Sequence, residues 1–203
     1  MIKLHHLNRS RSLRILWLLE ELGLDYTIIR YEREAKTNLA PSELLTLHPL
    51  GKSPMIEMDG RLISESAAII EVICAKYGKQ MIPAADTDAY ITHMELMHFA
   101  EGSVMTPILL DLYTAKLGDA AAPLQPRIKS ELTKHFAYME QTLRPSGHWV
   151  SDNLSATDII LSFPATIVLQ YGMANQFPKV AAFVDWMQNR RAFKAALTRG
   201  GGD

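Results

Sequence analysis

The segment from His48 to Ile56 places a lysine, a serine and a proline at the start of an apolar run. Pro54 begins a candidate strand, where it cannot donate a ladder hydrogen bond, and this position favours an edge strand or a cis peptide bond. The N–H and C=O of Ser53 would then face an extended peptide, which could bind as a short added strand. Lys52 beside them can hold a carboxylate. The segment is therefore a candidate peptide-binding edge.

A helix start further along the chain offers a complementary set of groups. Ser64 can cap a helix over residues 65–77. The free N–H groups and the dipole of a helix start favour a carboxylate, and the hydroxyl of Ser66 adds a donor. Glu65 can bind an ammonium group. Together these groups suit an amino-acid zwitterion, and with Lys52 they suit a short peptide that has a second acidic end.

The elements that must position these residues alternate strand formers with apolar helical patterns. In order they are strand 2–7, helix 13–22, strand 26–31, short helix 41–47, strand 54–58, strand 61–63 and helix 65–77. A strand, a helix and a second strand in this order predict a parallel pair. The Asp59-Gly60 pair predicts a hairpin between the last two strands. The sequence thus predicts an α/β domain of βαβαββα order over residues 1–79.

The pattern changes after a proline-containing linker at residues 80–86, because only helical periodicity follows. We expect an all-α helical-bundle domain over residues 87–203, with a disordered tail from Gly200. One capping box is evident inside it, with Ser155 as the cap and Asp158 at N3. Replacing Ser155 by alanine is expected to cost about 0.5–2 kcal/mol.

Composition excludes several classes of protein. The net charge of −1 and the lack of a long basic run argue against a nucleic-acid partner. No stretch approaches the roughly 20 apolar residues that span a bilayer, and the N-terminus lacks a signal-peptide pattern. The only cysteine, Cys74, is expected to be a buried apolar residue, and it rules out a Cys-x-x-Cys oxidoreductase. We expect a cytoplasmic protein with no metal and no membrane association.

The Pro-Leu-Gly-Lys-x-Pro motif and the later Glu-Ser-Ala-Ala-Ile-Ile motif, with the order of elements around them, resemble the thioredoxin-like domain of glutathione transferases. The helical remainder resembles the second domain of that family, which carries a Ser/Thr-x-x-Asp box. The resemblance implies that Pro54 is cis and that Ser53 pairs with the cysteinyl backbone of glutathione. It implies that Glu65 and Ser66 bind the γ-glutamyl end, with Lys52 as a further contact.

The resemblance also implies an activity, a ligand and an assembly. The activity is detoxifying transfer of the glutathione thiolate to small apolar electrophiles, and reduction of organic peroxides by the same thiolate stays open. Glutathione is then a co-substrate, no cofactor is needed, and the protein is a homodimer. The alternative is a non-catalytic protein of the same fold that binds glutathione or another ligand.

The catalytic group must lower the pKa of the glutathione thiol, because a free thiol titrates at about 8.5 and the thiolate is the nucleophile. Family members use Tyr, Ser or Cys in the loop after the first strand, and here residues 8–12 contain only serines of these types. Ser10 is the first candidate, because it precedes the helix and leaves Ser12 to cap it. Ser12 is the alternative. The further candidates are Arg11 as a cation, and Asn8 or His6 as donors.

The resemblance places the electrophile between this loop and the long helix that starts near Asp86. The residues implied in that pocket are Asn8, Met105 and Leu109.

Overall fold

The computed structural model describes residues 1–202, which divide into two compact units. The first unit joins Met1–Gln80 to the segment that starts at Met187, and the second unit is Met81–Trp186. The sequence analysis predicts one helical domain over residues 87–203. The structure instead groups the segment from Met187 onward with the first unit. Asp203, the last residue of that predicted domain, lies outside the described residues.

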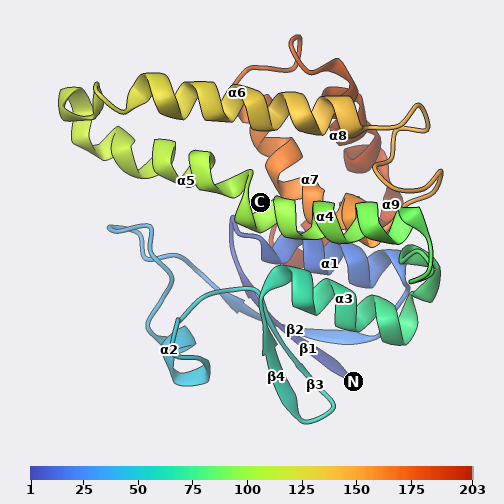
Figure 1. Ribbon diagram of the computed structural model, residues 1–203. Helices are drawn as coiled ribbons and strands as arrows, with labels where there is room; N and C mark the ends of the chain where they lie inside the picture. The colour runs from blue at the N-terminus through green and yellow to red at the C-terminus, as the bar shows by residue number, and fades with distance from the viewer. Residues whose placement is uncertain (203) are drawn as a thin grey trace. The chain divides into compact units, whose positions relative to one another are not determined.

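The first unit is built on one sheet with the strand order β2-β1-β3-β4 (Figure 1). The strands are β1 (Ile2–Leu7), β2 (Tyr26–Tyr31), β3 (Met55–Met58) and β4 (Arg61–Ser64). β1 pairs with β2 in parallel, and the other two pairings are antiparallel. These findings confirm the predicted α/β fold with its parallel pair and its hairpin.

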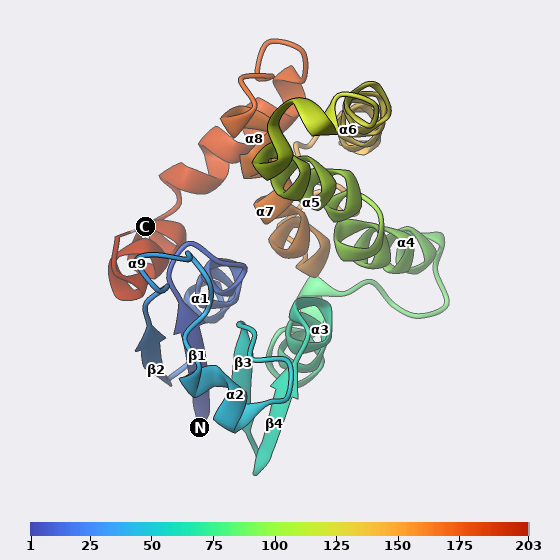
Figure 2. The same ribbon diagram turned by 90° about the vertical axis from the view of Figure 1, so that its left-hand side faces the viewer.

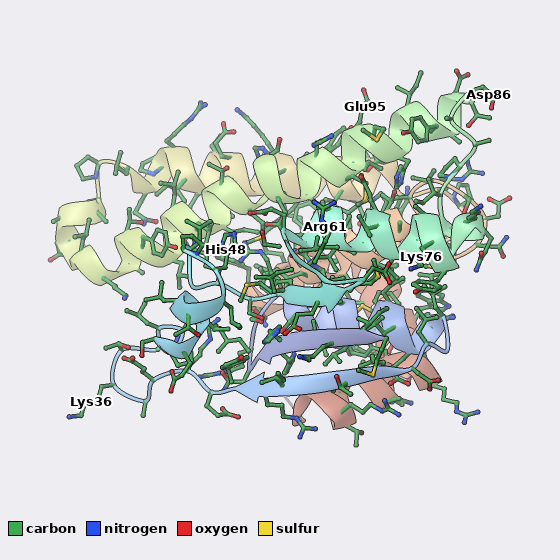
Figure 3. All side chains as sticks on the ribbon, turned by 90° about the horizontal axis from the view of Figure 1, so that it is seen from below. Lys36, His48, Arg61, Lys76, Asp86 and Glu95 are labelled. Atoms are coloured by element: carbon green, nitrogen blue, oxygen red, sulfur yellow. The ribbon has the colours of Figure 1, made fainter. Side chains whose placement is uncertain are left out.

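Two helices connect the strands, and a third follows the last strand. They are α1 (Ser12–Glu21), the short α2 (Glu43–Leu47) and α3 (Ser66–Tyr77). α1 and α3 contact each other and the sheet, and Figure 2 shows them side by side. Lys76 is labelled on α3 in Figure 3. It forms an ion pair with Asp59 of the hairpin turn, at 2.5 Å between Nζ and Oδ2.

The apolar character of α1 on nearly every side is explained by what packs around it. Its residues from Ile15 to Leu19 are all 0% exposed. The sheet and α3 cover part of α1, and α9 (Arg191–Gly200) covers another part. The Trp17 and Phe193 rings meet edge to face at 5.6 Å between centroids. The carboxylate of Glu21 accepts from Arg190 Nε at 2.5 Å and Nη2 at 2.7 Å, so the contact has an apolar centre and a charged rim.

Gly200 is the last residue of α9 and is buried. The expectation of disorder from Gly200 onward is therefore wrong at this residue. The amphipathic stripe of α9 finds a partner in α1, and burial of that stripe orders the helix to its end.

The second unit is helical, as predicted. Its main helices are α4 (Asp88–Gly102), α5 (Met105–Thr114), α6 (Gln125–Thr142), α7 (Ala156–Gln170) and the greater part of α8 (Pro178–Asn189). A short 3₁₀ helix lies at Ala115–Ala121 in this unit, and another, Lys79–Met81, lies where the chain passes from the first unit to the second. α4 packs against α7, and α5 packs against α6. No helix within residues 1–202 has the length and apolar character needed to cross a bilayer.

The capping box predicted at the start of α7 is confirmed. Ser155 Oγ accepts the N–H of Asp158, and Asp158 Oδ2 accepts the N–H of Ser155 at 2.7 Å. Asp158 does more than close the box, because its Oδ1 also accepts the N–H of Trp149 at 3.0 Å. Asp158 is 0% exposed, so one buried carboxylate joins the helix start to the loop before it.

Cys74 lies in the core of the first unit and is 0% exposed, as predicted. Burial raises the pKa of its thiol to about 12. Because a thiol with such a pKa is protonated at neutral pH, Cys74 is not a nucleophile in the folded protein.

Candidate functional site

A buried line of polar atoms runs from β1 into the loop before α1. Ser12 Oγ lies 2.8 Å from His6 Nδ1 and 2.7 Å from Ser10 Oγ. It also lies 3.2 Å from the carbonyl oxygen of Leu7. Ser12 is 0% exposed, His6 is 3% exposed and Ser10 is 9% exposed. Of the two candidate serines, only Ser10 therefore keeps accessible surface.

The hydroxyl that bonds the start of α1 belongs to Ser10 and not, as expected, to Ser12. α1 begins at Ser12, and no side chain caps it from the N-cap position, which is Arg11. The Oγ of Ser10 instead accepts the N–H of Ser12 at 3.2 Å. The expectation that Ser12 caps α1 is wrong, because its hydroxyl turns inward to His6. This contact was missed, although a histidine on a buried strand signals a buried polar partner.

The first part of the same loop is held by the residues that follow β2. The guanidinium of Arg33 donates to the carbonyl oxygens of Asn8, at 3.2 Å, and Arg9, at 3.3 Å. Burial and, after it, the charge of Arg9 lower the pKa of Arg33 from its usual value. Arg9 has a φ of 45°, a left-handed conformation that a side chain rarely adopts without such support. Arg33 thus shapes the loop that carries Ser10.

Asn8 was a candidate both for thiol activation and for the electrophile pocket. Its side chain instead helps to hold the loop against the residues after β2. Its Nδ2 donates to Glu32 Oε2 at 2.6 Å, and its Oδ1 accepts the N–H of Arg33 at 3.0 Å. With both ends of the amide bonded to the segment after β2, this geometry gives Asn8 a structural part in the loop.

The peptide bond between Ser53 and Pro54 is cis, as predicted. Ladder pairing between β1 and β3 stops at His5 and Met55, just before the proline. The hydroxyl of Ser53 continues the connection, because it donates to the carbonyl oxygen of His5 at 2.8 Å and accepts the N–H of Leu7 at 3.2 Å. Sequence reasoning missed this role.

The inward hydroxyl of Ser53 leaves its main chain available. Within residues 1–202, neither the N–H nor the C=O of Ser53 forms a hydrogen bond. An extended ligand would find one donor and one acceptor at this position, as a strand edge provides.

The start of α3 has an unusual backbone. Glu65 is the N-cap residue, with φ 68° and ψ 120°, and no side chain caps the helix. The expected cap by Ser64 is therefore wrong, since Ser64 is the last residue of β4. A non-glycine residue in this region costs about 1–3 kcal/mol, and such residues cluster at ligand-binding sites. The uncapped N–H groups, with the buried Ser66 among the first residues of the helix, have the polarity that suits an anionic group.

The remaining predicted site residues are Lys52, Arg11, Met105 and Leu109. Lys52 is exposed and forms no ion pair within the described chain, and Arg11 is partly exposed. Met105 is 2% exposed in the core of the second unit, and Leu109 on the same helix is half-buried. The electrophile pocket therefore stays a prediction. Across residues 1–202, no group of at least three His, Cys, Asp or Glu residues is placed to hold a metal ion.

The sheet order, the cis proline and the helical second unit define a thioredoxin-like domain combined with an all-helical one. Residues 1–74 match the family described as "Glutathione S-transferase, N-terminal domain". The chain is 36% identical over 179 residues to Glutathione S-transferase 3 of Schizosaccharomyces pombe, across 81% of this chain and 73% of the relative.

Other relatives extend the similarity over nearly the whole length. Glutathione S-transferase 1 of Saccharomyces cerevisiae is 26% identical over 220 residues, across 97% of this chain and 94% of the relative. A crystal structure of a glutathione S-transferase from Actinobacillus pleuropneumoniae superimposes with a TM-score of 0.91 at 32% identity, covering 100% of this chain and 94% of that one. The chain belongs to the glutathione S-transferase family.

Proposed function

We propose that this protein is an enzyme that transfers the thiolate of glutathione to small apolar electrophiles in the reducing environment of the cytoplasm. The observation that carries the proposal is the unpaired main chain of Ser53 in the same unit as the uncapped start of α3. Membership of the family supports it, because the relatives above are themselves described as glutathione S-transferases.

Glutathione would bind as a short extended strand. Its cysteinyl N–H and C=O would pair with the main chain of Ser53, as in strand addition. Its γ-glutamyl carboxylate would meet the N–H groups at the start of α3 and the hydroxyl of Ser66, and its ammonium group would meet Glu65. Lys52 would bind the glycyl carboxylate.

The thiol of bound glutathione would then lose its proton to solvent water, and the thiolate would attack the electrophilic carbon. The hydroxyl of Ser10 would donate a hydrogen bond to the sulfur, which favours the thiolate over the thiol. The partial charge of the start of α1 and the cation of Arg11 would act in the same direction. The sulfur forms a bond to carbon, and the leaving group departs with its electron pair.

Glutathione binding is expected to weaken by about 10- to 100-fold on Glu65→Gln, because a charge-assisted hydrogen bond is lost. Isothermal titration with glutathione measures the change. Glu71→Gln is the matched control, since it makes the same charge change within α3 and should bind like the wild type. Equal affinity of both variants would contradict the proposed γ-glutamyl site.

Turnover separates the enzyme from a binding protein of the same fold. Retention of the wild type on immobilised glutathione, with conjugation of a chromogenic aryl halide, is the expected result. Retention without conjugation would favour the non-catalytic alternative.

We further propose that the protein forms a homodimer through the groove between α4 and α6. The Phe99 ring lies 5.9 Å from the His135 ring and 5.0 Å from the Tyr138 ring, between centroids. Tyr138 is 41% exposed, so this aromatic cluster reaches the surface. Glu95 and Lys134 also line the groove, and charges of both signs let a two-fold copy pair with itself.

Sedimentation at low micromolar concentration is expected to give twice the chain mass of 22.8 kDa. Tyr138→Glu should shift the protein toward the monomer, because it places a charge in the apolar centre of the groove. Lys129→Glu, an exposed change on the same helix outside the groove, should leave the dimer intact. A monomeric wild type would contradict the proposal.

A further inference from the structure

We propose that His6 is a positioning residue that sets the direction of the Ser12–Ser10 hydroxyl pair, so that the proton of Ser10 points toward the glutathione sulfur. This inference rests on the proposed function. Its structural basis is the continuous contact from His6 Nδ1 to Ser12 Oγ, at 2.8 Å, and from there to Ser10 Oγ, at 2.7 Å.

The hydroxyl groups of Ser12 and Ser10 each have a single proton, so the hydrogen bonds from His6 to Ser10 can run in only a few directions. If Nδ1 of His6 is an acceptor, the proton of Ser12 goes to the imidazole. Ser12 can then only accept from Ser10, and the proton of Ser10 points inward. Ser10 would offer only lone pairs to the sulfur, and a thiolate cannot use them.

When the hydrogen bonds run from His6 toward Ser10, the hydroxyl of Ser10 can donate to the sulfur. With a proton on Nδ1, His6 donates to Ser12, and Ser12 donates onward to Ser10. Ser10 Oγ already accepts the N–H of Ser12 at 3.2 Å, so both its lone pairs are then used. Its own proton is left to point outward. The competing acceptor of Ser12, the Leu7 carbonyl oxygen at 3.2 Å, is farther away than Ser10.

The direction of these hydrogen bonds also affects how strongly the Ser10 hydroxyl donates. Hydrogen bonds that follow one another in the same sense polarise each other, and the effect is larger where water is excluded. His6 and Ser12 are 3% and 0% exposed, so this line is shielded from water. A polarised Ser10 hydroxyl would stabilise the thiolate more than an isolated serine would.

The last residue of α9 packs closely against the imidazole. A Cβ atom built on Gly200 would lie 3.2 Å from His6 Nε2 and 3.3 Å from Cε1. It would also lie 3.2 Å from Leu16 Cδ1, so neither neighbour leaves room for a methyl group. The absence of a side chain at Gly200 thus lets α9 lie against the ring whose Nδ1 faces Ser12.

The test compares two replacements of His6 in full-length protein. The amide nitrogen of asparagine in His6→Asn can stand near the place of Nδ1 and donate, whereas His6→Leu has no donor. We expect His6→Leu to raise the pKa of the bound glutathione thiol by about 0.5–1 unit, a 3- to 10-fold loss of thiolate at a pH below that pKa. His6→Asn should recover most of it, and the Kd for glutathione should stay within about twofold of the wild type in both.

The ultraviolet absorbance of the thiolate, followed against pH, gives the thiol pKa. His93→Leu is the matched control, because it removes a buried histidine that bonds a hydroxyl, Thr157 Oγ1, at 2.8 Å in the other unit. Its bound thiol should titrate like that of the wild type. Equal thiol pKa values for the wild type and a folded His6→Leu would overturn the proposal.

Two further measurements keep the outcome clear. Gly200→Ala should displace the ring by a few tenths of an ångström and raise the thiol pKa in the same sense as His6→Leu, and no shift would count against the proposal. Nuclear magnetic resonance of the imidazole nitrogens in the ligand-free protein reads the tautomer directly. A proton on Nδ1 is expected, and a bare Nδ1 would overturn the proposal even if glutathione binds and reacts. Failure of glutathione to bind, with Nδ1 protonated, would instead reject the proposed function alone.

Discussion

Replacing Asp158 by alanine is expected to lower the free energy of unfolding by about 3–5 kcal/mol. The carboxylate is 0% exposed and accepts the N–H groups of Trp149 and Ser155 as well as the hydroxyl of Ser155. Alanine leaves these donors buried without a partner, and each buried unsatisfied group costs about 1–3 kcal/mol. Lost packing adds to this loss, because a cavity replaces the carboxyl group.

Urea unfolding followed by circular dichroism measures the change, with Ser155→Ala as the graded comparison. Ser155→Ala removes only the hydroxyl of the box and should cost about 0.5–2 kcal/mol. Asp152→Ala is the exposed control, because the Asp152 side chain is 74% exposed in its ion pair with Arg144 and should contribute at most about 1 kcal/mol. A loss at Asp158 no greater than the loss at Ser155 would contradict the central role of this carboxylate.

The order of elements in the first unit was predictable, because local signals specify it. Alternating strand formers, an apolar helix and an Asp-Gly turn are all read within short windows of sequence. The partner of α9 was not predictable in the same way. The stripe on α9 shows that one face must be buried, but periodicity does not say against what, and Arg190 and Glu21 meet although they lie far apart in the chain.

The candidate site shows the same division between local and tertiary information. The cis bond before Pro54 and the presence of a helix start beside Glu65 follow from motifs and were predicted, but the cap expected from Ser64 is absent. The inward turns of the Ser53 and Ser12 hydroxyls were not predicted. Both depend on β1, which supplies the His5 and Leu7 main chain to one and the His6 imidazole to the other. A serine near a helix start favours capping, but a buried acceptor within reach can outcompete that role.

Ser10→Ala is expected to raise the pKa of the bound glutathione thiol by more than about one unit, or 1.4 kcal/mol, and to lower kcat by on the order of 10²-fold. The reason is that the hydroxyl would donate to a sulfur whose negative charge must be stabilised before attack. Glutathione affinity should change little, because the Ser53, Glu65 and Ser66 contacts remain. Thiolate absorbance against pH gives the thiol pKa, and steady-state conjugation of an aryl halide gives kcat.

Ser12→Ala and Arg11→Gln separate Ser10 from the other groups of its loop. Ser12→Ala interrupts the line from His6 but leaves the Ser10 hydroxyl in place, so its effect on the thiol pKa should be smaller than that of Ser10→Ala. Arg11→Gln removes the cation and keeps both serines. If Ser10→Ala left the thiol titration unchanged while Arg11→Gln raised the pKa, the thiolate would be stabilised by charge and not by the hydroxyl. The buried serine pair would then be only part of the start of α1.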